Sequence, residues 1–363
     1  MPKKAKKKII LDFDISIGGV NLTQKAILAR HLSIMLKAGL TLSEALEISL
    51  EQAAGKLKKV LAGVYTSIQS GQSLTNSLAR YPKVFSEMFV SIVRAGEISG
   101  TLEENLTNIA DQLEKERELN SKIKGAMLYP MVVSIAAFGL GLAMAFLVLP
   151  KITPLFEGLK IDLPFTTRAL IWFSHLIEEQ GLILFLGLTG FFIFMFWLVK
   201  KKFSRPVTHW FFLHLPIIKK ITRYSNLSRF CGSLGIQLKS GLNIDEAMEI
   251  AKTTLGNYYY QQSLNKISLT VSKGTKLSEQ LAYYDKLYPK LTTRMIKVGE
   301  ETGKLDETLL FLAHFYEVEV DNSTKSLSTA IEPVLLIIIG LVVGFLALSI
   351  ITPIYEITGN VQR

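Results

Sequence analysis

Long runs of apolar residues without charged side chains occur three times in the chain, at residues 126–150, 180–199 and 333–355. Each run is long enough to cross a hydrocarbon layer about 30 Å thick as an α-helix. The first run begins too far along the chain to be a signal peptide, and the Lys-rich N-terminus has no apolar stretch of the needed length behind its charges. The pattern therefore predicts an integral membrane protein with three transmembrane helices.

Between these runs, hydrophobic residues recur at the spacing of one helix face. After Gly100 they are Leu102, Leu106, Ile109 and Leu113, and after Gly303 they are Leu305, Leu309, Leu312 and Tyr316. Capping boxes, in which two side chains three residues apart satisfy free amides, are predicted at three helix starts: Asn21 with Gln24, Thr41 with Glu44, and Asn243 with Glu246. We expect an all-α protein whose short helices are joined by tight turns.

The chain contains an internal repeat. Residues 37–48 and 239–250 are identical at seven of twelve positions, and residues 95–106 and 298–309 at six of twelve. The Tyr129-Pro130 and Glu332-Pro333 pairs, at the start of the first and third apolar runs, also correspond. A repeat of this kind predicts two copies of one structural unit, here a helical domain followed by its transmembrane helix.

Combining the runs with the repeat predicts the order of the domains. They are a Lys-rich tail (1–20), a first cytoplasmic helical domain (21–128), a transmembrane helix (129–150), an external loop (151–179), a second transmembrane helix (180–199), a second cytoplasmic helical domain (200–330), a third transmembrane helix (331–355) and an external tail (356–363).

The orientation follows from the basic residues, which are retained on the cytoplasmic side. Five lysines lie in the first eight residues, and Lys200, Lys201, Lys202 and Arg205 follow the second run, whereas residues 151–179 carry three basic against four acidic side chains. The N-terminus is therefore expected in the cytoplasm. The net charge of +10 is attributed to this bias and to attraction by anionic membrane lipid. Binding of nucleic acid is not expected, because no basic stripe with interleaved aromatic residues is present.

The most conspicuous motif is a repeated Gly-Glu-x-x-Gly-x-Leu stretch, which in the second copy continues through Lys304. A phosphate-binding loop needs four residues between its glycines and a Ser or Thr after the lysine. Here three residues separate Gly299 from Gly303, and Leu305 follows Lys304. The motif is therefore interpreted as a tight turn between two helices, at which glycine lets the backbones approach closely.

Polar residues beside this turn are candidates either for local ion pairs or for contacts with a partner protein. The candidates are Arg94, Gly96, Glu97, Gly100 and Leu102 in the first copy, and Lys297, Gly299, Glu300, Gly303 and Leu305 in the second. Leu102 and Leu305 are expected to occupy equivalent buried sites.

Other candidates for chemistry are weak, and no catalytic, cofactor or metal site is predicted. Cys231 is the only cysteine and is expected to be a packed or semi-exposed structural thiol. His209 and His214 are five residues apart and would point in different directions on a helix. Glu114 and Glu118 would share a helix face on which a hard cation could sit, although a solvated surface is the favoured interpretation.

The apolar runs contain no ionisable residue in their core, whereas transporters and proton relays usually place one in the membrane. Gly340 and Gly344 form a Gly-x-x-x-Gly pair in the third run, a spacing that lets membrane helices pack closely. The runs are therefore interpreted as anchors that pack against other helices.

The doubled motif, the three runs and their order resemble the inner-membrane platform proteins of type IV pilus and type II secretion machines, the PilC/GspF family, over residues 23–355. The resemblance implies an oligomeric, non-enzymatic scaffold without a cofactor in the cytoplasmic (inner) membrane of a prokaryote. It also implies that the partners are a hexameric cytoplasmic ATPase, pilin-like subunits and other inner-membrane assembly proteins. A small polytopic transporter or channel subunit is the main alternative, and a membrane enzyme is a third. An intramembrane charge would favour a transporter or channel, and a nucleophile with its base would favour an enzyme. The sequence shows neither feature.

Overall fold

The computed structural model describes residues 19–144, 146, 151 and 165–360, and within them the chain is helical without a β-strand. The predicted all-α class is confirmed for this part of the chain. Its contacts divide the chain into two compact units. The first comprises residues 1–119, 226–256 and 260–316, and the second comprises residues 120–225, 257–259 and 317–363.

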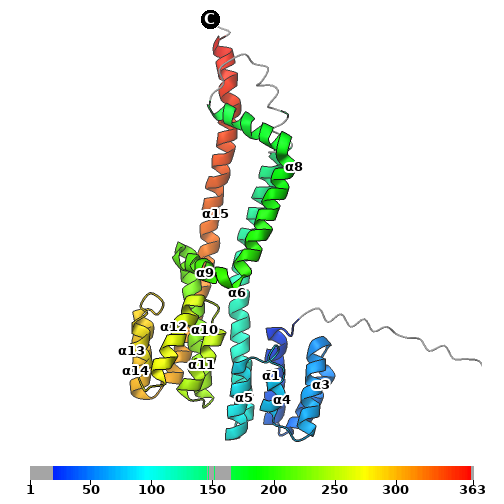
Figure 1. The fold of residues 1–363 in the computed structure, drawn as a ribbon, viewed down its shortest axis with the longest axis vertical. Coiled ribbons are helices and arrows are strands. Elements are labelled where there is room, and N and C mark those ends of the chain that lie inside the picture. Colours follow the sequence, from blue (N-terminus) through cyan, green and yellow to red (C-terminus); the bar gives the residue numbers. More distant parts are fainter. Residues whose placement is uncertain (1–18, 145, 147–150, 152–164, 361–363) are drawn as a thin grey trace, which may run out of the picture. The chain divides into compact units, whose positions relative to one another are not determined.

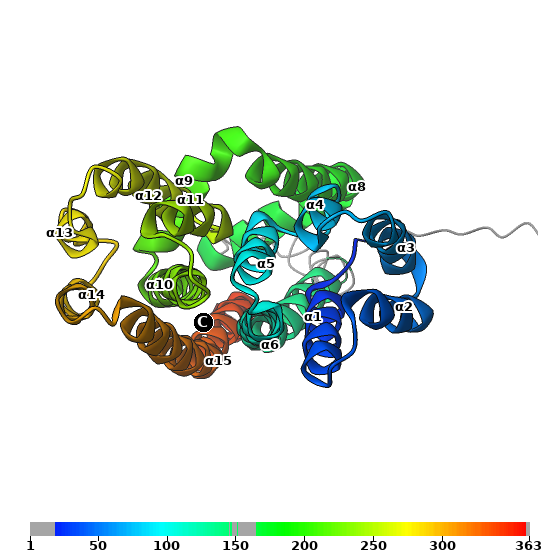
Figure 2. The same cartoon turned by 90° about the horizontal axis from the view of Figure 1, so that it is seen from below.

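The helical domains of both copies lie mainly in the first unit, although residues 216–225 and 257–259 belong to the second (Figures 1 and 2). The first copy contains α1 (Leu22–Lys37), α2 (Leu42–Gln52), α3 (Gly55–Gln69), α4 (Leu74–Ala79), α5 (Glu87–Ser99) and the start of α6 (Leu102–Ala143). The second contains α10 (Pro216–Lys239), α11 (Ile244–Thr254), α12 (Tyr258–Val271), α13 (Leu277–Ala282), α14 (Lys290–Thr302) and the start of α15 (Leu305–Asn360). In Figure 2, α5 and α6 of the first copy face α10 and α11 of the second.

Each copy has its own apolar core, built from the inward faces of these helices. The largest completely buried side chains of the first copy are Leu46, Leu61, Leu74, Phe85, Phe89, Ile92, Leu106 and Ile109. Those of the second copy include Phe230, Tyr260, Tyr288 and Tyr316. Cys231 is also completely buried, which confirms that it is a packed thiol, and burial raises its pKa above the ordinary value.

The predicted capping boxes are present in the first copy but not in the second. Asn21 accepts from the Gln24 amide at 2.7 Å, and Thr41 accepts from the Glu44 amide at 3.3 Å. In each case the returning side chain accepts from the N-cap amide. Asn243 lies at the N-cap of α11 but makes no side-chain capping bond. The third box was therefore a wrong prediction, because the Glu246 carboxylate pairs with Arg94 instead.

The second unit contains most of the apolar sequence. It includes α8 (Phe165–Lys200), the 3₁₀ turn η2 (Lys202–Ser204), α9 (Arg205–His214) and the C-terminal parts of α6 and α15. Among the described residues, α6 and the part of α15 from Leu305 to Ser349 are long and apolar enough to cross a membrane. The expected second span, at 180–199, lies within α8 and includes side chains outside the described part, so this transmembrane helix stays a prediction.

Candidate functional site

The repeated motif forms the corner between α5 and α6 in the first copy and between α14 and α15 in the second. Gly100 and Gly303 end the preceding helices with φ angles of 75° and 71°. This left-handed conformation is strained for residues with a Cβ and is the usual C-terminal stop of a helix. The next helix begins two residues later in both copies.

The other glycine of each corner lets the two helices touch. A Cβ added to Gly96 would lie 2.9 Å from the Cα of Leu102. A Cβ added to Gly299 would lie 3.1 Å from the Cα of Leu305 and 2.9 Å from the Oγ1 of Thr308. Any larger residue would therefore push the helices apart.

The glutamate beside this glycine binds the start of a third helix. Glu97 accepts hydrogen bonds from the amides of Leu74 at 2.6 Å and Thr75 at 3.0 Å, and from the Thr75 hydroxyl. These amides are the first two of α4 and have no partner within that helix. The carboxylate also carries the charge that a helix N-terminus favours. Glu97 is thus an N-terminal cap supplied from another helix.

The second copy repeats this contact. Glu300 accepts from the amides of Leu277 at 2.6 Å and Ser278 at 3.2 Å, and from the Ser278 hydroxyl. These are the first two amides of α13. The N-cap residue of this helix, Lys276, makes no side-chain capping bond, whereas Ser73 at the N-cap of α4 accepts from the Asn76 amide.

Sequence reasoning placed these glutamates at the corner but missed their partners. A usable indication was present, because the hydroxyl residues Thr75 and Ser278 are separated by the same 203 residues as the two glutamates. A hydroxyl at the second position of the short helix in both copies indicates that the same kind of acceptor faces it in each copy.

Leu102 and Leu305 were expected to be buried, and that prediction was wrong. Both are half-buried, whereas Leu106 and Leu309 are completely buried. The reason is their position, since each is the first residue of its helix and its Cα lies against the corner glycine. The residue one turn later points into the core.

The basic residues of the corner behave differently in the two copies. Arg94 Nη1 lies 3.2 Å from a carboxylate oxygen of Glu246 on α11, so it joins the first copy to the second. Lys297 lies 3.8 Å from Glu301, one turn along its own helix. All four side chains are about half exposed, and such pairs contribute under ~1 kcal/mol each.

A buried seam between the copies lies next to the first corner. The amide nitrogen Nδ2 of Asn105 donates to the carbonyl of Ile92 at 3.1 Å and to that of Ser240 at 3.4 Å. A Cβ added to Gly232 of α10 would lie 3.3 Å from the amide of Gln112. Since Asn105 is buried and bonded to both copies, it holds α10 against α5 and α6.

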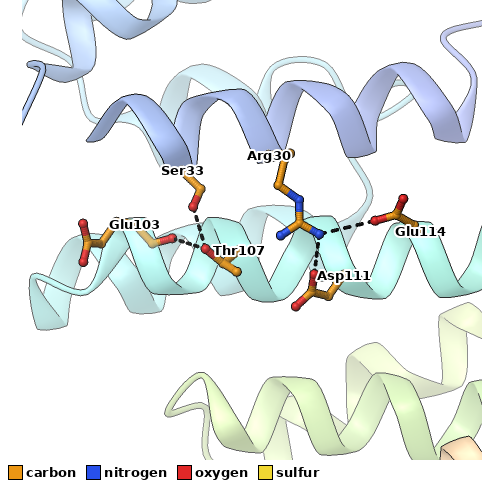
Figure 3. A network of polar contacts seen from close by, with 6 residues as sticks. All are labelled: Arg30, Ser33, Glu103, Thr107, Asp111 and Glu114. Carbon is orange, nitrogen blue, oxygen red and sulfur yellow. Dashed lines mark hydrogen bonds and ion pairs between the residues drawn. The ribbon is translucent and has the colours of Figure 1, made fainter. Parts of the chain in front are cut away.

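A polar network joins α1 to α6 in the first copy (Figure 3). Arg30 pairs with Asp111 and, at 3.3 Å, with Glu114, while the hydroxyls of Ser33 and Thr107 lie 2.5 Å apart. The hydrogen bond to Asp111 raises the pKa of Arg30 above its ordinary value. Glu114, considered above as half of a cation site with Glu118, thus has a cationic partner within the chain.

The remaining candidates are dispersed. His209 Nδ1 accepts from the Tyr258 amide at 2.9 Å, whereas His214 stacks on Trp210 with ring centroids 4.0 Å apart. Within the described part of the chain, no group of three or more His, Cys, Asp or Glu side chains could hold a metal ion. A Cβ added to Gly340 or Gly344 would meet nothing within 4 Å, so this small-residue face of α15 is open within the described residues.

Comparison with known proteins agrees with the repeat. The family model described as Type II secretion system (T2SS), protein F matches residues 28–150 and again residues 230–353. A type IV pilus assembly protein PilC from Thermus thermophilus is 36% identical over 345 residues, which cover 95% of this chain and 85% of that protein. A type II secretion system protein F from Aeromonas hydrophila is 34% identical over 95% of this chain and 89% of that protein. A PilC from Myxococcus xanthus is 32% identical over 99% and 87%, respectively.

Proposed function

Because the chain belongs to the PilC/GspF family of type II secretion protein F and type IV pilus assembly proteins, we propose that it is a membrane platform of such a machine. In this proposal it has no enzymatic activity of its own. It couples a hexameric cytoplasmic ATPase to the insertion or removal of pilin-like subunits, together with other inner-membrane assembly proteins.

The continuity of two long helices carries this proposal. α6 runs for 42 residues, with Pro130 inside it, and α15 runs for 56, and each continues from the first unit into the second. Each therefore joins a corner of the repeat to an apolar, membrane-compatible stretch within one helix. In this proposal, the two helices carry a displacement of the first unit by a motor to these apolar stretches.

The two apolar helices and the family support a membrane protein. The finer topology belongs to the proposal: three spans in the cytoplasmic membrane, the N-terminus and residues 200–330 in the cytoplasm, and residues 151–179 outside. A His175→Cys variant in a background lacking Cys231 should react with an impermeant thiol reagent in intact cells. Reaction only after membrane disruption would overturn the orientation.

The surface that meets the motor is proposed to include the exposed polar side of the corners. The carboxylates of Glu97 and Glu300 already accept backbone amides, which favours a structural role for them. Lys297, with its exposed ion pair, is the better candidate for a partner contact. Reversal of its charge, Lys297→Glu, should weaken association with the ATPase while the thermal unfolding midpoint stays unchanged.

The experiment that tests the platform role interrupts helix continuity. A short glycine segment inserted after Lys124 of α6 should abolish filament formation or protein export while the protein remains in the membrane. The same segment inserted after Gly39, in the exposed turn between α1 and α2, is the matched control and should be tolerated. Normal function with the Lys124 insertion would contradict coupling through α6. Normal filaments and export in a strain without the protein would overturn the platform role itself.

A separate experiment tests whether the protein binds or hydrolyses ATP. The purified protein should neither bind nor hydrolyse ATP, because the stretch from Gly299 to Lys304 forms the helix corner described above. Hydrolysis that is lost in a Lys304→Ala variant would reverse this interpretation.

A further inference from the structure

Helix α9 exposes an aromatic face that the described part of the chain does not cover. Val207, Trp210 and Phe211 recur at the spacing of one helix face, and they are 67%, 48% and 57% exposed. Phe203, in the turn just before α9, is 92% exposed. No residue of α9 is buried, which is unusual for a helix with so much apolar surface.

One side of α9, next to the aromatic face, is attached to the protein, and these contacts fix the orientation of the helix. His209 accepts from the Tyr258 amide at 2.9 Å, and the carbonyl of Pro206 accepts from the Tyr259 hydroxyl at 3.2 Å. His209 is partly shielded from solvent, and this burial lowers its pKa, as does the nearby charge of Arg205. The neutral imidazole is the form that can accept the Tyr258 hydrogen bond.

The charged residues that flank α9 in the sequence are all basic. No Asp or Glu occurs between Glu179 and Asp245, whereas nine Lys and Arg residues fall in that interval. Lys201, Arg205, Lys219 and Lys220 are exposed. A partner for this surface must therefore be anionic as well as apolar.

The position of α9 in the chain identifies that partner. Trp197, in the last turn of α8, is exposed, and the Nζ of Lys201 lies 4.1 Å from its ring centroid. Tryptophan beside lysine is typical of the membrane–water boundary. At Lys201 the backbone becomes extended, and α9 then runs across the direction of α8 (Figure 1). The aromatic face thus begins next to the expected boundary.

We propose that η2 and α9 form an anchor that lies in the plane of the membrane surface and binds anionic phospholipid headgroups. Trp210, Phe211, Val207 and Phe203 enter the headgroup–acyl boundary, and the basic side chains bind the headgroup phosphates. Amphipathic helices with basic and aromatic residues bind membranes in this way. The anchor rests on the proposed function in one respect, since it takes α8 to be a transmembrane helix.

Quenching of single tryptophans by brominated lipid tests the anchor. The full-length protein would be placed in nanodiscs of zwitterionic phosphatidylcholine, with or without anionic phosphatidylglycerol. Trp210 is isolated by Trp172→Phe and Trp197→Phe, and Trp197 is isolated by Trp172→Phe and Trp210→Phe. Bromine near the glycerol end of the acyl chain should quench Trp210 more than bromine near the methyl end. Anionic lipid should increase this shallow quenching.

A charge variant and its control test headgroup recognition. Arg205→Gln, Lys219→Gln and Lys220→Gln together should remove the increase caused by anionic lipid. The matched set Lys56→Gln, Lys58→Gln and Lys83→Gln, on exposed parts of the first copy, should leave it unchanged. Circular dichroism and size-exclusion chromatography verify that both sets fold.

The two tryptophans separate the failure of this inference from that of the proposed topology. Quenching of Trp197 without quenching of Trp210 would overturn the anchor and leave α8 as a span. Absence of quenching for both would overturn the two together. Equal quenching of Trp210 with and without anionic lipid would overturn headgroup recognition. Shielding of Trp210 from lipid by an added ATPase would assign the face to a protein partner and also overturn the anchor.

Discussion

The two copies of the repeat use the same backbone geometry around cores of different chemistry. In the second copy, Ser263 and Tyr288 share a buried hydrogen bond of 2.9 Å, and Thr292 and Tyr316 share one of 2.6 Å. The residues 203 positions earlier are Val60, Phe85, Phe89 and Leu113, which are apolar and buried. Each polar residue is thus accompanied by a polar partner. A core can exchange apolar packing for hydrogen bonds when both members of a pair change, because a buried polar group without a partner is costly.

The corners, in contrast, keep the same glycine and glutamate in both copies, because these residues contact the backbone itself. Gly96 and Gly299 permit contact between helices, and Glu97 and Glu300 satisfy amides at the start of α4 and α13. A backbone amide is present whatever the residue type. The loss of a side chain that accepts from it therefore cannot be compensated by a second substitution. The comparison therefore predicts similar effects for matched changes at the corners, and coupled effects for the hydrogen-bonded pairs that only the second core contains.

Removal of the first core leucine of α6 or α15 should have the largest effect. Leu106 and Leu309 are both completely buried, so Leu106→Ala and Leu309→Ala should each lower the free energy of unfolding by about 2–5 kcal/mol. The control variants Leu102→Ala and Leu305→Ala should cost clearly less, because those side chains are half-buried. Thermal or denaturant unfolding would measure the difference. Equal losses at all four positions would contradict the assignment of the cores.

Changes to the Thr292–Tyr316 pair should be coupled. Tyr316→Phe or Thr292→Val removes this buried hydrogen bond, at a cost of about 1–3 kcal/mol. The double variant should cost less than the sum, and the two hydroxyls would then show a coupling energy in a double-mutant cycle. Additive losses would mean that the hydrogen bond between them does not account for their presence.

Neutralising the capping glutamates should give matched, intermediate effects. Glu97→Gln and Glu300→Gln keep the shape but remove the charge and one acceptor oxygen, which should cost about 1–2 kcal/mol each. Hydrogen exchange should quicken at the amides of Leu74 and Thr75 in one case, and of Leu277 and Ser278 in the other. If exchange rises only at remote amides, the caps do not stabilise these helices.

The ion pair between the copies should contribute less. Arg94→Glu should lower stability by under ~1 kcal/mol, because the Arg94–Glu246 pair is about half exposed. The double variant Arg94→Glu with Glu246→Arg should restore most of the loss. The same exchange at Lys297 and Glu301 should leave the contact between the copies unaffected. Crosslinking between α5 and α11 reports on that contact, and failure of the double variant to restore it would argue against a direct pair.

The smallest effect should be a local response to pH at the start of α12. The Tyr258 amide is capped by His209, whereas no side chain caps α3 of the first copy. The pKa of His209 is lowered from 6.5, so the unfolded chain binds a proton more readily than the folded one. The stabilisation is therefore present above pH 6.5 and is lost as the pH falls through the folded pKa. The protection of the Tyr258 amide, which is the intrinsic exchange rate divided by the measured rate at the same pH, should fall on acidification, and in a His209→Phe variant this protection should not depend on pH.

The sequence alone determined the features that depend on neighbouring residues. The capping boxes at Asn21 and Thr41, the stops at Gly100 and Gly303 and the helix faces after them involve positions within one or two turns. Local hydrogen bonds, left-handed glycine and the helical period act over that range whatever the rest of the chain does. The repeat and the apolar runs are likewise visible from residue order.

The tertiary structure decided the features that depend on residues far apart in the chain. Glu97 meets amides more than twenty residues earlier, and Glu246 leaves its predicted capping box because Arg94 reaches it from the first copy. Leu102 stays half-buried because the corner glycine receives its backbone and not its side chain. In each case several partners of suitable chemistry exist along the chain, and only packing decides which of them comes within hydrogen-bond distance.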